Sequence, residues 1–339
     1  MTNSIRVLDL FAGGGGSSYG ARAAGCRIVA GVDAWDIASA TYARNFPGAQ
    51  ALNLRLEGSR LHAQVKQVGQ IDLMLASPEC TNHTPARGSR PRSEESRMTA
   101  WQVIHHARAF SPKWIVIENV IQMRTWDRFP DFEQELECLG YDISAQVLDA
   151  SDFGVPQSRR RLFMLCSRVG PVATVVPAEG VQRRSVRDIL DPAGTWRVTP
   201  LFRDGRAAAT LERAERAFAA LGKREPFLLV YYGSDAAGGW QTLDRPLRTM
   251  TTLDRFGLVE PTPGGHTMRM LQVPELSRAM GFGSDFKLDI GTRREQVRLL
   301  GNGVCPPVMT AIVSAQISAD AATRPRSRRT SAAGGRLSA

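Results

Sequence analysis

The first 33 residues combine two short apolar segments, a run of glycines and an acidic residue in a fixed order. Residues 5–10 are mostly apolar and lead to Phe11-Ala12-Gly13-Gly14-Gly15-Gly16, and residues 27–32 lead to Asp33. Apolar runs that end at turn residues are typical of buried parallel strands, and glycines between a strand and a helix let a ligand approach the backbone. An acid after the second strand can accept the ribose hydroxyls of a nucleoside cofactor. This order predicts a Rossmann-like α/β fold with a cofactor site.

Two alternatives remain open on these residues alone. Nicotinamide, flavin and S-adenosylmethionine proteins all use glycine turns of this kind, so the turn does not identify the cofactor. Asp33 could instead be an ordinary cap for the helix that we expect to begin near Trp35. The complete order of strand, glycine turn, helix, strand and acid favours cofactor binding.

A third apolar run, residues 71–76, ends at Ser77-Pro78 and is followed by Cys80. Because open α/β sheets bind ligands at the carboxyl ends of their strands, Cys80 is a candidate nucleophile at the edge where a substrate would bind. Most isolated cysteines are inert buried side chains, and Cys80-x-x-His83 could be half of a zinc site. No second pair of ligands has matching spacing, which argues against zinc.

A fourth apolar run, residues 113–117, is also expected to be a buried strand. Glu118 follows at its carboxyl end and would share a sheet edge with Cys80, where a carboxyl group can donate or accept a proton. Residues 85–97 lie between the two strands and are rich in Arg, Ser and Pro. This segment is either a loop that closes over substrate or a merely solvated connection.

A basic run follows Gln157. If this part of the chain is extended, Arg159 and Arg161 face one side and Arg160 the other. Two guanidinium groups on one face suit a phosphate or the polar edge of a base. Without further context the run is only a basic strand.

Six short motifs occur in one order along the chain. They are Phe11-x-Gly13-x-Gly15, Asp33, Pro78-x-Cys80, Glu118-Asn119-Val120, Gln157-x-Arg159-x-Arg161 and Gly301-Asn302-Gly303-Val304. Their order resembles the DNA (cytosine-5) methyltransferases over about residues 5–317, with the main break between residue 169 and about residue 243. Any one motif is weak, whereas six in register are specific. The resemblance implies a Rossmann-like S-adenosylmethionine-dependent methyltransferase sheet with helices on both faces, plus a smaller variable DNA-recognition domain.

The resemblance implies a role for each catalytic candidate. In the family a thiolate that matches Cys80 attacks carbon 6 of cytosine, and a glutamate that matches Glu118 protonates or hydrogen-bonds ring nitrogen 3. Arg161 would steady the base or the thiolate, and Arg159 would support it. Methyl transfer from S-adenosylmethionine to carbon 5 requires the cytosine to be flipped out of double-stranded DNA.

The resemblance also implies the residues of the cofactor pocket. By match they are Phe11, Ala12, Gly13, Gly15, Gly16, Asp33, Ala34 and Asn302. Asn302 would contact the methionine end of the cofactor, and no metal is expected. Because the aromatic that commonly follows the ribose acid comes one residue later here, at Trp35, the contacts to adenine stay open.

A second departure from the family pattern is Glu79, which stands where the family usually has proline. A carboxylate beside a thiolate raises the pKa of the cysteine if it faces inward, and we expect Glu79 to point to solvent. The departure motivates one alternative function, a catalytically weakened cofactor-binding or DNA-binding homologue. A tRNA cytosine-5 methyltransferase is the other alternative, and the sizeable variable region favours duplex DNA.

The composition changes in the middle of the chain. Residues 1–168 together with about 266–318 are expected to form a discontinuous catalytic and cofactor-binding domain. Between them Pro, Gly and Arg are frequent, with an amphipathic helix near residues 207–221 and a strand at residues 227–232. By resemblance, about residues 169–265 form a target-recognition domain. A structural insert without DNA contacts is the alternative.

The formal net charge is +10, and it is unevenly distributed. Five arginines and no acid occur after residue 323, so about half of the excess lies in a tail (319–339) that we expect to be disordered. The rest permits nucleic-acid binding without proving it. No signal peptide, disulfide framework or apolar run long enough to cross a bilayer is evident. We expect a cytoplasmic protein of bacterial or phage origin that acts on double-stranded DNA as a monomer and does not bind a membrane. A cognate restriction endonuclease is not inferable from the chain.

Overall fold

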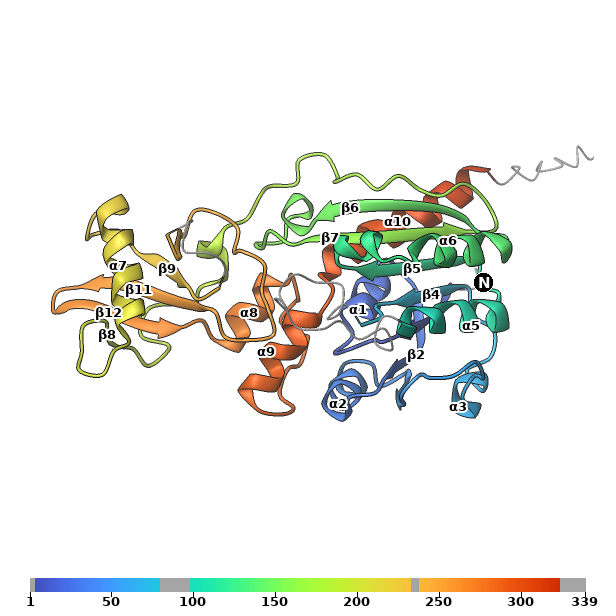
Figure 1. Cartoon of the computed structure of the whole chain (residues 1–339), viewed down its shortest axis with the longest axis horizontal. Coiled ribbons are helices and arrows are strands. Elements are labelled where there is room, and N and C mark those ends of the chain that lie inside the picture. Colours follow the sequence, from blue (N-terminus) through green and yellow to red (C-terminus); the bar gives the residue numbers. More distant parts are fainter. Residues whose placement is uncertain (1–3, 80–97, 233–237, 324–339) are drawn as a thin grey trace, which may run out of the picture.

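The structure is a computed structural model that describes residues 4–79, 98–232 and 238–323. The chain forms an elongated molecule in which a larger and a smaller β-sheet occupy opposite ends of the long axis (Figure 1). Cys80, the basic segment 85–97 and most of the expected tail lie outside the described residues. The candidate site is therefore built from the described residues around Cys80.

The larger sheet has seven strands in the order β3-β2-β1-β4-β5-β7-β6. The strands span Arg6–Leu10 (β1), Arg27–Asp33 (β2), Gln50–Asn53 (β3), Leu73–Ala76 (β4), Trp114–Asn119 (β5), Asp142–Asp149 (β6) and Arg160–Ser167 (β7). β1 to β5 pair in parallel, and β7 runs antiparallel between β5 and β6. The order in which successive strands are added to the sheet reverses between β1 and β4. Sheets of this type bind ligands at such a point, beyond the carboxyl ends of their strands. The expected Rossmann-like α/β fold is confirmed.

Helices cover both faces of this sheet. Leu73 and Leu75 of β4 pack in one core with residues of α1, α2 and α10, whereas Met74 and Ala76 pack in a second core with residues of α3, α5 and α6. Apolar side chains on both sides of a strand are typical of a parallel sheet between two helical layers. The helices span Gly16–Ala23 (α1), Asp36–Asn45 (α2), Ala63–Lys66 (α3), Trp101–Phe110 (α5), Phe129–Cys138 (α6) and Pro306–Thr323 (α10).

The smaller sheet has five antiparallel strands in the order β10-β9-β11-β12-β8. The strands span Thr199–Pro200 (β8), Phe227–Val230 (β9), Trp240–Thr242 (β10), Phe256–Thr262 (β11) and Gly265–Met270 (β12). Helix α7 (Ala208–Leu221) packs on this sheet through a core of its own. The helix expected near residues 207–221 is confirmed, and the strand expected at residues 227–232 is β9, which ends two residues earlier. The boundary expected near residue 265 falls inside the β11–β12 hairpin, because Pro263-Gly264 forms its turn.

The chain returns to the larger sheet through α8 (Val273–Ala279), α9 (Arg293–Asn302) and α10. Helix α10 lies against α1 (Figure 1), and the hydroxyl of Thr310 donates a 2.9 Å hydrogen bond to the carbonyl of Gly20. A side chain at Gly20 would place its Cβ 2.5 Å from the carbonyl oxygen of Pro306, so this close packing requires glycine. The return brings the turn at residues 301–304 to the start of α1.

One stretch of the described chain, Arg293–Ala322, has the length and apolar composition of a membrane span. The sequence analysis expected no apolar run long enough to cross a bilayer, and this stretch, which joins α9 and α10, meets that criterion by length and composition only. Most of the stretch is buried in the protein, as expected for helices that belong to a protein core.

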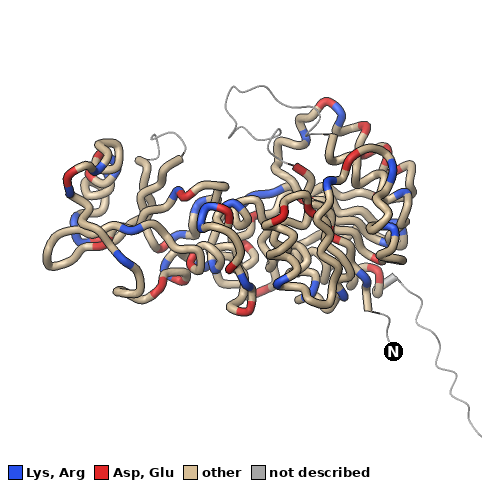
Figure 2. The backbone as a smooth tube through the Cα atoms, turned by 90° about the horizontal axis from the view of Figure 1, so that it is seen from below, with Lys and Arg blue, Asp and Glu red and all other residues tan. Residues whose placement is uncertain are grey.

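The charged residues are mixed in sign. Lys and Arg are interspersed with Asp and Glu along both ends of the described molecule (Figure 2).

Candidate active site

The ends of β4 and β5 lie side by side at the carboxyl edge of the larger sheet. Beyond β4, the carbonyl oxygen of Pro78 accepts a 3.1 Å hydrogen bond from the side-chain amide of Asn119, the last residue of β5. This bond fixes the backbone two residues before Cys80, which itself lies outside the described residues. The intervening Glu79 is exposed, as we expected.

The carboxyl group of Glu118 is buried next to a guanidinium group at the same edge. Glu118 is 6% exposed, and Nε of Arg161 lies 3.3 Å from its Oε1. Burial raises the pKa of Glu118, while the positive charges of Arg161 and Arg159 act in the opposite direction. A buried carboxyl with a raised pKa keeps its proton to higher pH than an exposed one. Such a group can donate a hydrogen bond when it is protonated and accept one when it is ionised.

Arg159 and Arg161 point to the same side of the chain, as expected. Together with Glu118 and Cys305 they line a cavity of ≈ 10 Å³, whereas Arg160 is exposed. A cavity of this size holds about one water molecule. The sequence analysis gave Cys305 no role, and the structure places this buried thiol beside the catalytic candidates.

Arg159 differs from Arg161 in its contacts. Its guanidinium donates hydrogen bonds to the backbone carbonyls of Met250 (3.1 Å), Gly301 (2.9 Å) and Gly303 (3.0 Å). These carbonyls belong to the segment after β10 and to the carboxyl end of α9 with its C-cap residue, Gly303. The observed contacts of Arg159 thus hold two distant segments beside the site.

Gln157 anchors the same segment and was quoted in the sequence analysis only as part of a motif. Its Oε1 accepts a 2.9 Å hydrogen bond from the backbone N–H of Met250, and its Nε2 donates to the carbonyl of Ala279 at 3.1 Å. Gln157 is fully buried, so both ends of its amide are satisfied inside the protein. In the sequence, the only indication of this anchoring role was the position of Gln157 two residues before Arg159.

The glycine turn contains two kinds of glycine. Gly13 has a φ of +54° and nothing within 4 Å of the position that a Cβ would occupy. At Gly15 and Gly16, by contrast, a Cβ would lie 2.4 Å from the ring of Phe46 and 2.4 Å from the carbonyl oxygen of Val304. Space for a ligand therefore exists at Gly13, whereas Gly15 and Gly16 are required by packing inside the protein.

The carboxylate of Asp33 closes the glycine turn from the end of β2. Its Oδ2 accepts a 2.8 Å hydrogen bond from the backbone N–H of Gly13, and its Oδ1 accepts one of 2.9 Å from that of Trp35. Burial raises the pKa of Asp33, and these hydrogen bonds oppose the rise. Asp33 thus joins the turn to the start of α2 and stays close to the space at Gly13, while the neighbouring Ala34 is exposed.

Asn302 is the last residue of α9 and is exposed. The turn that follows it packs directly on the glycine turn, since Val304 contacts Gly16. The first and the last of the six motifs, almost 300 residues apart in the chain, therefore meet at one place.

No group of three or more His, Cys, Asp or Glu side chains in the described ranges could hold a metal ion.

A buried polar chain lies behind the glycine turn and was not anticipated. The hydroxyl of Ser18 donates to Oδ2 of Asp9 at 2.7 Å and is hydrogen-bonded to the hydroxyl of Tyr42 at 2.7 Å. Burial raises the pKa of Asp9 from 3.8 to about 7, and the hydrogen bonds from Ser18 oppose the rise. An acid inside the first apolar run was the only sequence signal for this group.

Comparisons with known proteins identify the family. The profile of the C-5 cytosine-specific DNA methylase family matches residues 5–318. The type II methyltransferase M.HgiDI of Herpetosiphon aurantiacus is 29% identical to the chain over 304 residues, which make up 88% of this chain and 90% of that protein. The type II methyltransferase M.AplI of Arthrospira platensis is 25% identical over 335 residues, 95% of this chain and 88% of that protein.

A solved structure shows the same fold. The crystal structure of a DNMT2 mutant from Spodoptera frugiperda superposes with a TM-score of 0.66 at 18% identity, covering 93% of this chain and 100% of the other. The fold and site define a Rossmann-like methyltransferase. The chain belongs to the C-5 cytosine-specific DNA methylase family, and it is an S-adenosylmethionine-dependent DNA cytosine-5 methyltransferase.

Proposed function

We propose that this enzyme methylates cytosine through a covalent bond between Cys80 and carbon 6 of a base flipped out of double-stranded DNA. The observation that most supports the proposal is the buried Glu118, held against Arg161 beside the strand end that leads into Cys80. The base must leave the duplex because carbon 5 cannot be reached while the base is stacked.

Carbon 5 of cytosine is a weak nucleophile, so the ring must be activated before it can take a methyl group. The thiolate of Cys80 adds to carbon 6, and Glu118 hydrogen-bonds or protonates nitrogen 3 so that negative charge does not accumulate on the ring. The electron pair of the former double bond becomes available at carbon 5. After methylation, a base from the solvent removes the proton at carbon 5, which restores the double bond and breaks the carbon–sulfur bond. This step regenerates the thiolate, and Glu118 takes back any proton that it gave to nitrogen 3.

The two motif arginines have different parts in this proposal. Arg161 lies 3.3 Å from Glu118 and lines the same cavity, so it would steady the base or the thiolate directly. Arg159 contacts three backbone carbonyls and would act by holding their segments in position. Arg161 is therefore the catalytic arginine in the proposal, and Arg159 is a positioning residue.

The open space at Gly13 and the adjacent carboxylate fit a bound nucleoside. When bound, S-adenosylmethionine supplies the methyl group from its sulfonium centre. Asn302 would contact the methionine end, and Gly15 and Gly16 would shape the turn by packing. The remaining pocket residues would be Phe11, Ala12, Gly13, Asp33 and Ala34.

The smaller sheet is the proposed target-recognition domain. Its last strand runs to Met270, so we propose a boundary near residue 270 in place of 265. The catalytic domain would then comprise residues 1–168 and about 271–318. We propose that the enzyme acts as a monomer on DNA in the bacterial cytoplasm.

Duplex DNA that contains 5-fluorocytosine tests the covalent step. The reaction normally ends when the hydrogen at carbon 5 is removed as a proton, and fluorine cannot be removed in this way. In the presence of S-adenosylmethionine, the adduct with the wild-type enzyme should therefore persist and survive denaturation. Cys80→Ala should form no adduct, and Cys138→Ala, which removes an exposed thiol, should form it at the wild-type level. An adduct with Cys80→Ala would place the nucleophile elsewhere. Greater methyl incorporation into tRNA than into DNA would contradict the proposed substrate.

A further inference from the structure

We propose that Arg298 of α9 binds the ribose of the cofactor opposite Asp33, with the indole of Trp35 as its support. The inference rests on the proposed cofactor site and adds to it two residues that none of the six motifs contains. It also gives a function to the aromatic side chain that is displaced by one position from the family pattern.

Arg298 and Trp35 are in direct contact. Cζ of Arg298 lies 4.5 Å from the centroid of the Trp35 ring, which is a cation–π geometry. The backbone N–H of Trp35 donates to Oδ1 of Asp33 at 2.9 Å. The stacked pair is therefore connected to the carboxylate that would hold the ribose. A guanidinium that stacks on a ring keeps its N–H groups available for hydrogen bonds.

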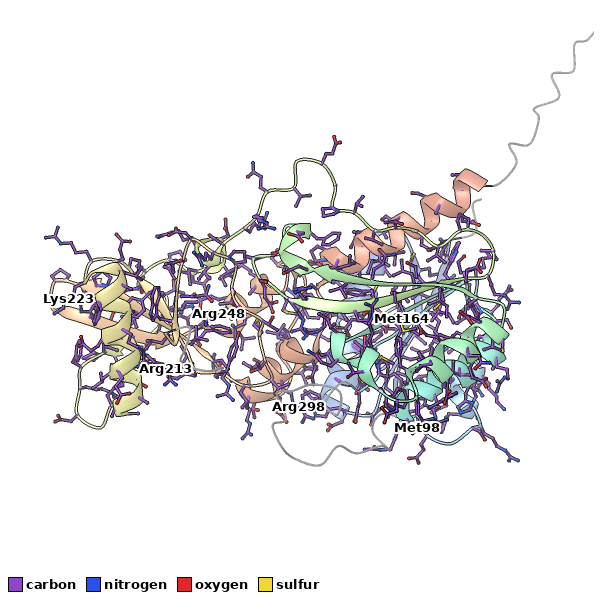
Figure 3. The ribbon with its side chains drawn as sticks, turned by 45° about the horizontal axis from the view of Figure 1, so that its top comes forward. Met98, Met164, Arg213, Lys223, Arg248 and Arg298 are labelled. Carbon is purple, nitrogen blue, oxygen red and sulfur yellow. The ribbon has the colours of Figure 1, made fainter. Side chains whose placement is uncertain are left out.

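The donors of Arg298 are not used inside the protein. Its side chain is exposed and projects from α9 (Figure 3), and within the ranges that the structure describes it makes no hydrogen bond or ion pair. Arg293 on the same helix is different, because its guanidinium binds Asp254, Gln272 and the carbonyl of Leu271. Of these two arginines, Arg298 is the one that can bind a ligand.

The charge of Arg298 acts on Asp33. It lowers the pKa of Asp33 against the rise caused by burial, and so favours the ionised carboxylate that can accept ribose hydroxyls. A ribose hydroxyl can donate to a carboxylate and accept from a guanidinium at the same time. Arg298 thus interacts with Asp33, the residue proposed to bind the ribose. This favours the ribose, rather than the carboxylate of the methionine part, as the ligand group of Arg298.

Helix α9 would present two cofactor contacts on one side. Asn302 follows Arg298 by four residues, a spacing that puts both side chains on the same face of a helix. Asn302 lies at the turn that packs on the glycine turn, and Arg298 lies one helical turn away, toward Trp35. The two contacts are spaced along the helix as the methionine end and the ribose of one ligand would require.

Calorimetry with two ligands tests the assignment. S-Adenosylhomocysteine carries both the ribose and the amino-acid carboxylate, whereas 5′-methylthioadenosine carries only the ribose. Arg298→Met should weaken binding of both ligands by roughly tenfold, the loss expected for hydrogen bonds of a charged donor. Arg298→Lys should lose less, and Trp35→Ala should weaken both ligands. Arg294→Met is the matched control, an exposed arginine of the same helix, and should bind both ligands as the wild type does.

Each outcome separates the inference from the proposed function. If the wild type binds both ligands and Arg298→Met binds them equally well, the inference is wrong while the cofactor site stands. A loss confined to S-adenosylhomocysteine would assign Arg298 to the carboxylate and overturn the ribose assignment. A wild-type enzyme that binds neither ligand would overturn the cofactor site itself. In methylation assays Arg298→Met should raise KM for the cofactor and leave kcat near the wild-type value.

Discussion

The side-chain amide of Asn119 donates a 3.1 Å hydrogen bond to the backbone carbonyl of Pro78, and it thereby ties the end of β5 to the chain that leads into Cys80. Its Oδ1 accepts a 2.8 Å hydrogen bond from the backbone N–H of Val120, so both ends of the amide are used. This bond lies beyond the last paired residues of the two strands, Ala76 and Ile117. We therefore expect Asn119 to help set how far the proposed nucleophile lies from the strand that carries Glu118.

Asn119→Asp tests this connection, because aspartate can accept from Val120 but cannot donate to Pro78. We expect kcat to fall about tenfold, the size of one lost hydrogen bond at a site that must be held in register. The affinity for S-adenosylhomocysteine should not change. Steady-state methylation and calorimetry measure the two quantities, and an unchanged kcat would mean that the Pro78 contact does not position Cys80.

Glu118 predicts a pH dependence with a definite sign. Burial raises its pKa, so its protonated, hydrogen-bond-donating form is lost as the pH rises through that raised pKa. Single-turnover rates of the wild type should therefore fall on the alkaline side. Glu118→Gln should be slower by about 100-fold or more, and this limb should be absent because an amide donates at every pH. A Gln variant that kept the same alkaline limb would assign the titration to another group.

The strand ends that carry the site could be predicted because their signals are local. An apolar run that stops at a turn residue identifies a strand and its end, and the parallel arrangement then brings different strand ends to one edge. Asp33 and Glu118 were placed in this way. The orientation of Arg159 and Arg161 also followed from the two-residue period of an extended chain.

The partners of these residues could not be predicted, because they come from distant parts of the chain. Arg159 bonds to carbonyls 91 and 142 residues away, and a carbonyl has no sequence signature. The contact between Trp35 and Arg298 depends on how α9 returns to the larger sheet. The pairing of β11 with β12 is likewise non-local information, because the change of composition near residue 265 does not show that a hairpin turns there.

The three consecutive arginines at positions 159–161, where β7 begins at Arg160, should respond differently to substitution. Arg159→Ala leaves three backbone carbonyls without their donor, and we expect a loss of about 2–4 kcal/mol in the free energy of unfolding. Arg161→Ala should lower kcat with a smaller loss of stability, because this side chain pairs with Glu118 at the site. Arg160→Ala, at an exposed position, is the control and should change neither. Urea unfolding and methylation rates of the three variants check the division, and equal effects at positions 159 and 161 would contradict it.

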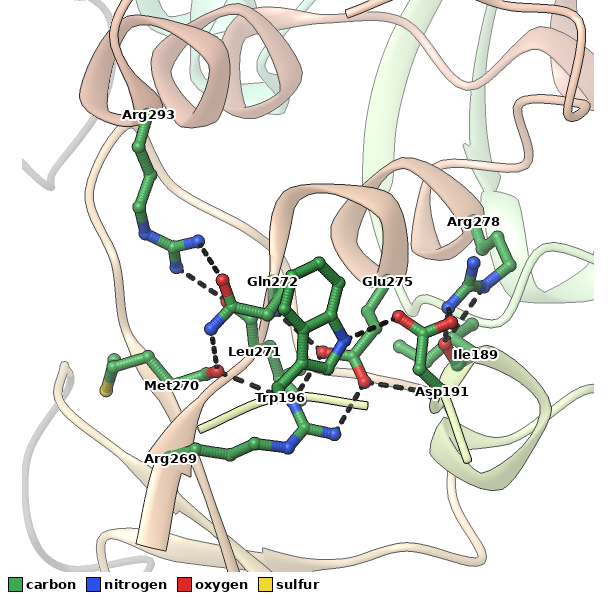
Figure 4. A network of polar contacts seen from close by, with 10 residues as sticks. All are labelled: Ile189, Asp191, Trp196, Arg269, Met270, Leu271, Gln272, Glu275, Arg278 and Arg293. Carbon is green, nitrogen blue, oxygen red and sulfur yellow. Dashed lines mark hydrogen bonds and ion pairs between the residues drawn. The ribbon is translucent and has the colours of Figure 1, made fainter. Parts of the chain in front are cut away.

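Arg269 and Glu275 form a buried, bidentate ion pair between β12 and α8, with both N–O distances at 2.7 Å (Figure 4). The carboxylate also accepts from the backbone N–H groups of Gln272 at 2.7 Å and Asp191 at 3.0 Å. Glu275→Ala would leave the Arg269 charge buried without a partner and should cost about 3–5 kcal/mol of unfolding free energy. The double variant Arg269→Met/Glu275→Leu should be more stable than Glu275→Ala, because no buried charge remains. Urea unfolding compares them, and a less stable double variant would show that the apolar pair cannot replace the ionic one.

Asp9 predicts how the stability of the fold depends on pH. Its pKa is raised from 3.8 to about 7 because it is buried behind the glycine turn. Between about pH 4 and pH 7 the folded protein therefore holds a proton that the unfolded chain has lost. Stability from this group must fall as the pH rises through that window, and it must level off above it.

Asp9→Asn isolates the effect, because asparagine can still accept the hydrogen bond from Ser18 but does not titrate. The unfolding free energy of the wild type minus that of the variant should decrease by up to about 4 kcal/mol between pH 4 and pH 8, since each pKa unit corresponds to about 1.4 kcal/mol. Urea unfolding at a series of pH values gives this difference, in which the other titrating groups cancel. Parallel stability curves for the two proteins would show that Asp9 is ionised in the fold, and its burial would then need a positive charge that the described residues around it do not supply.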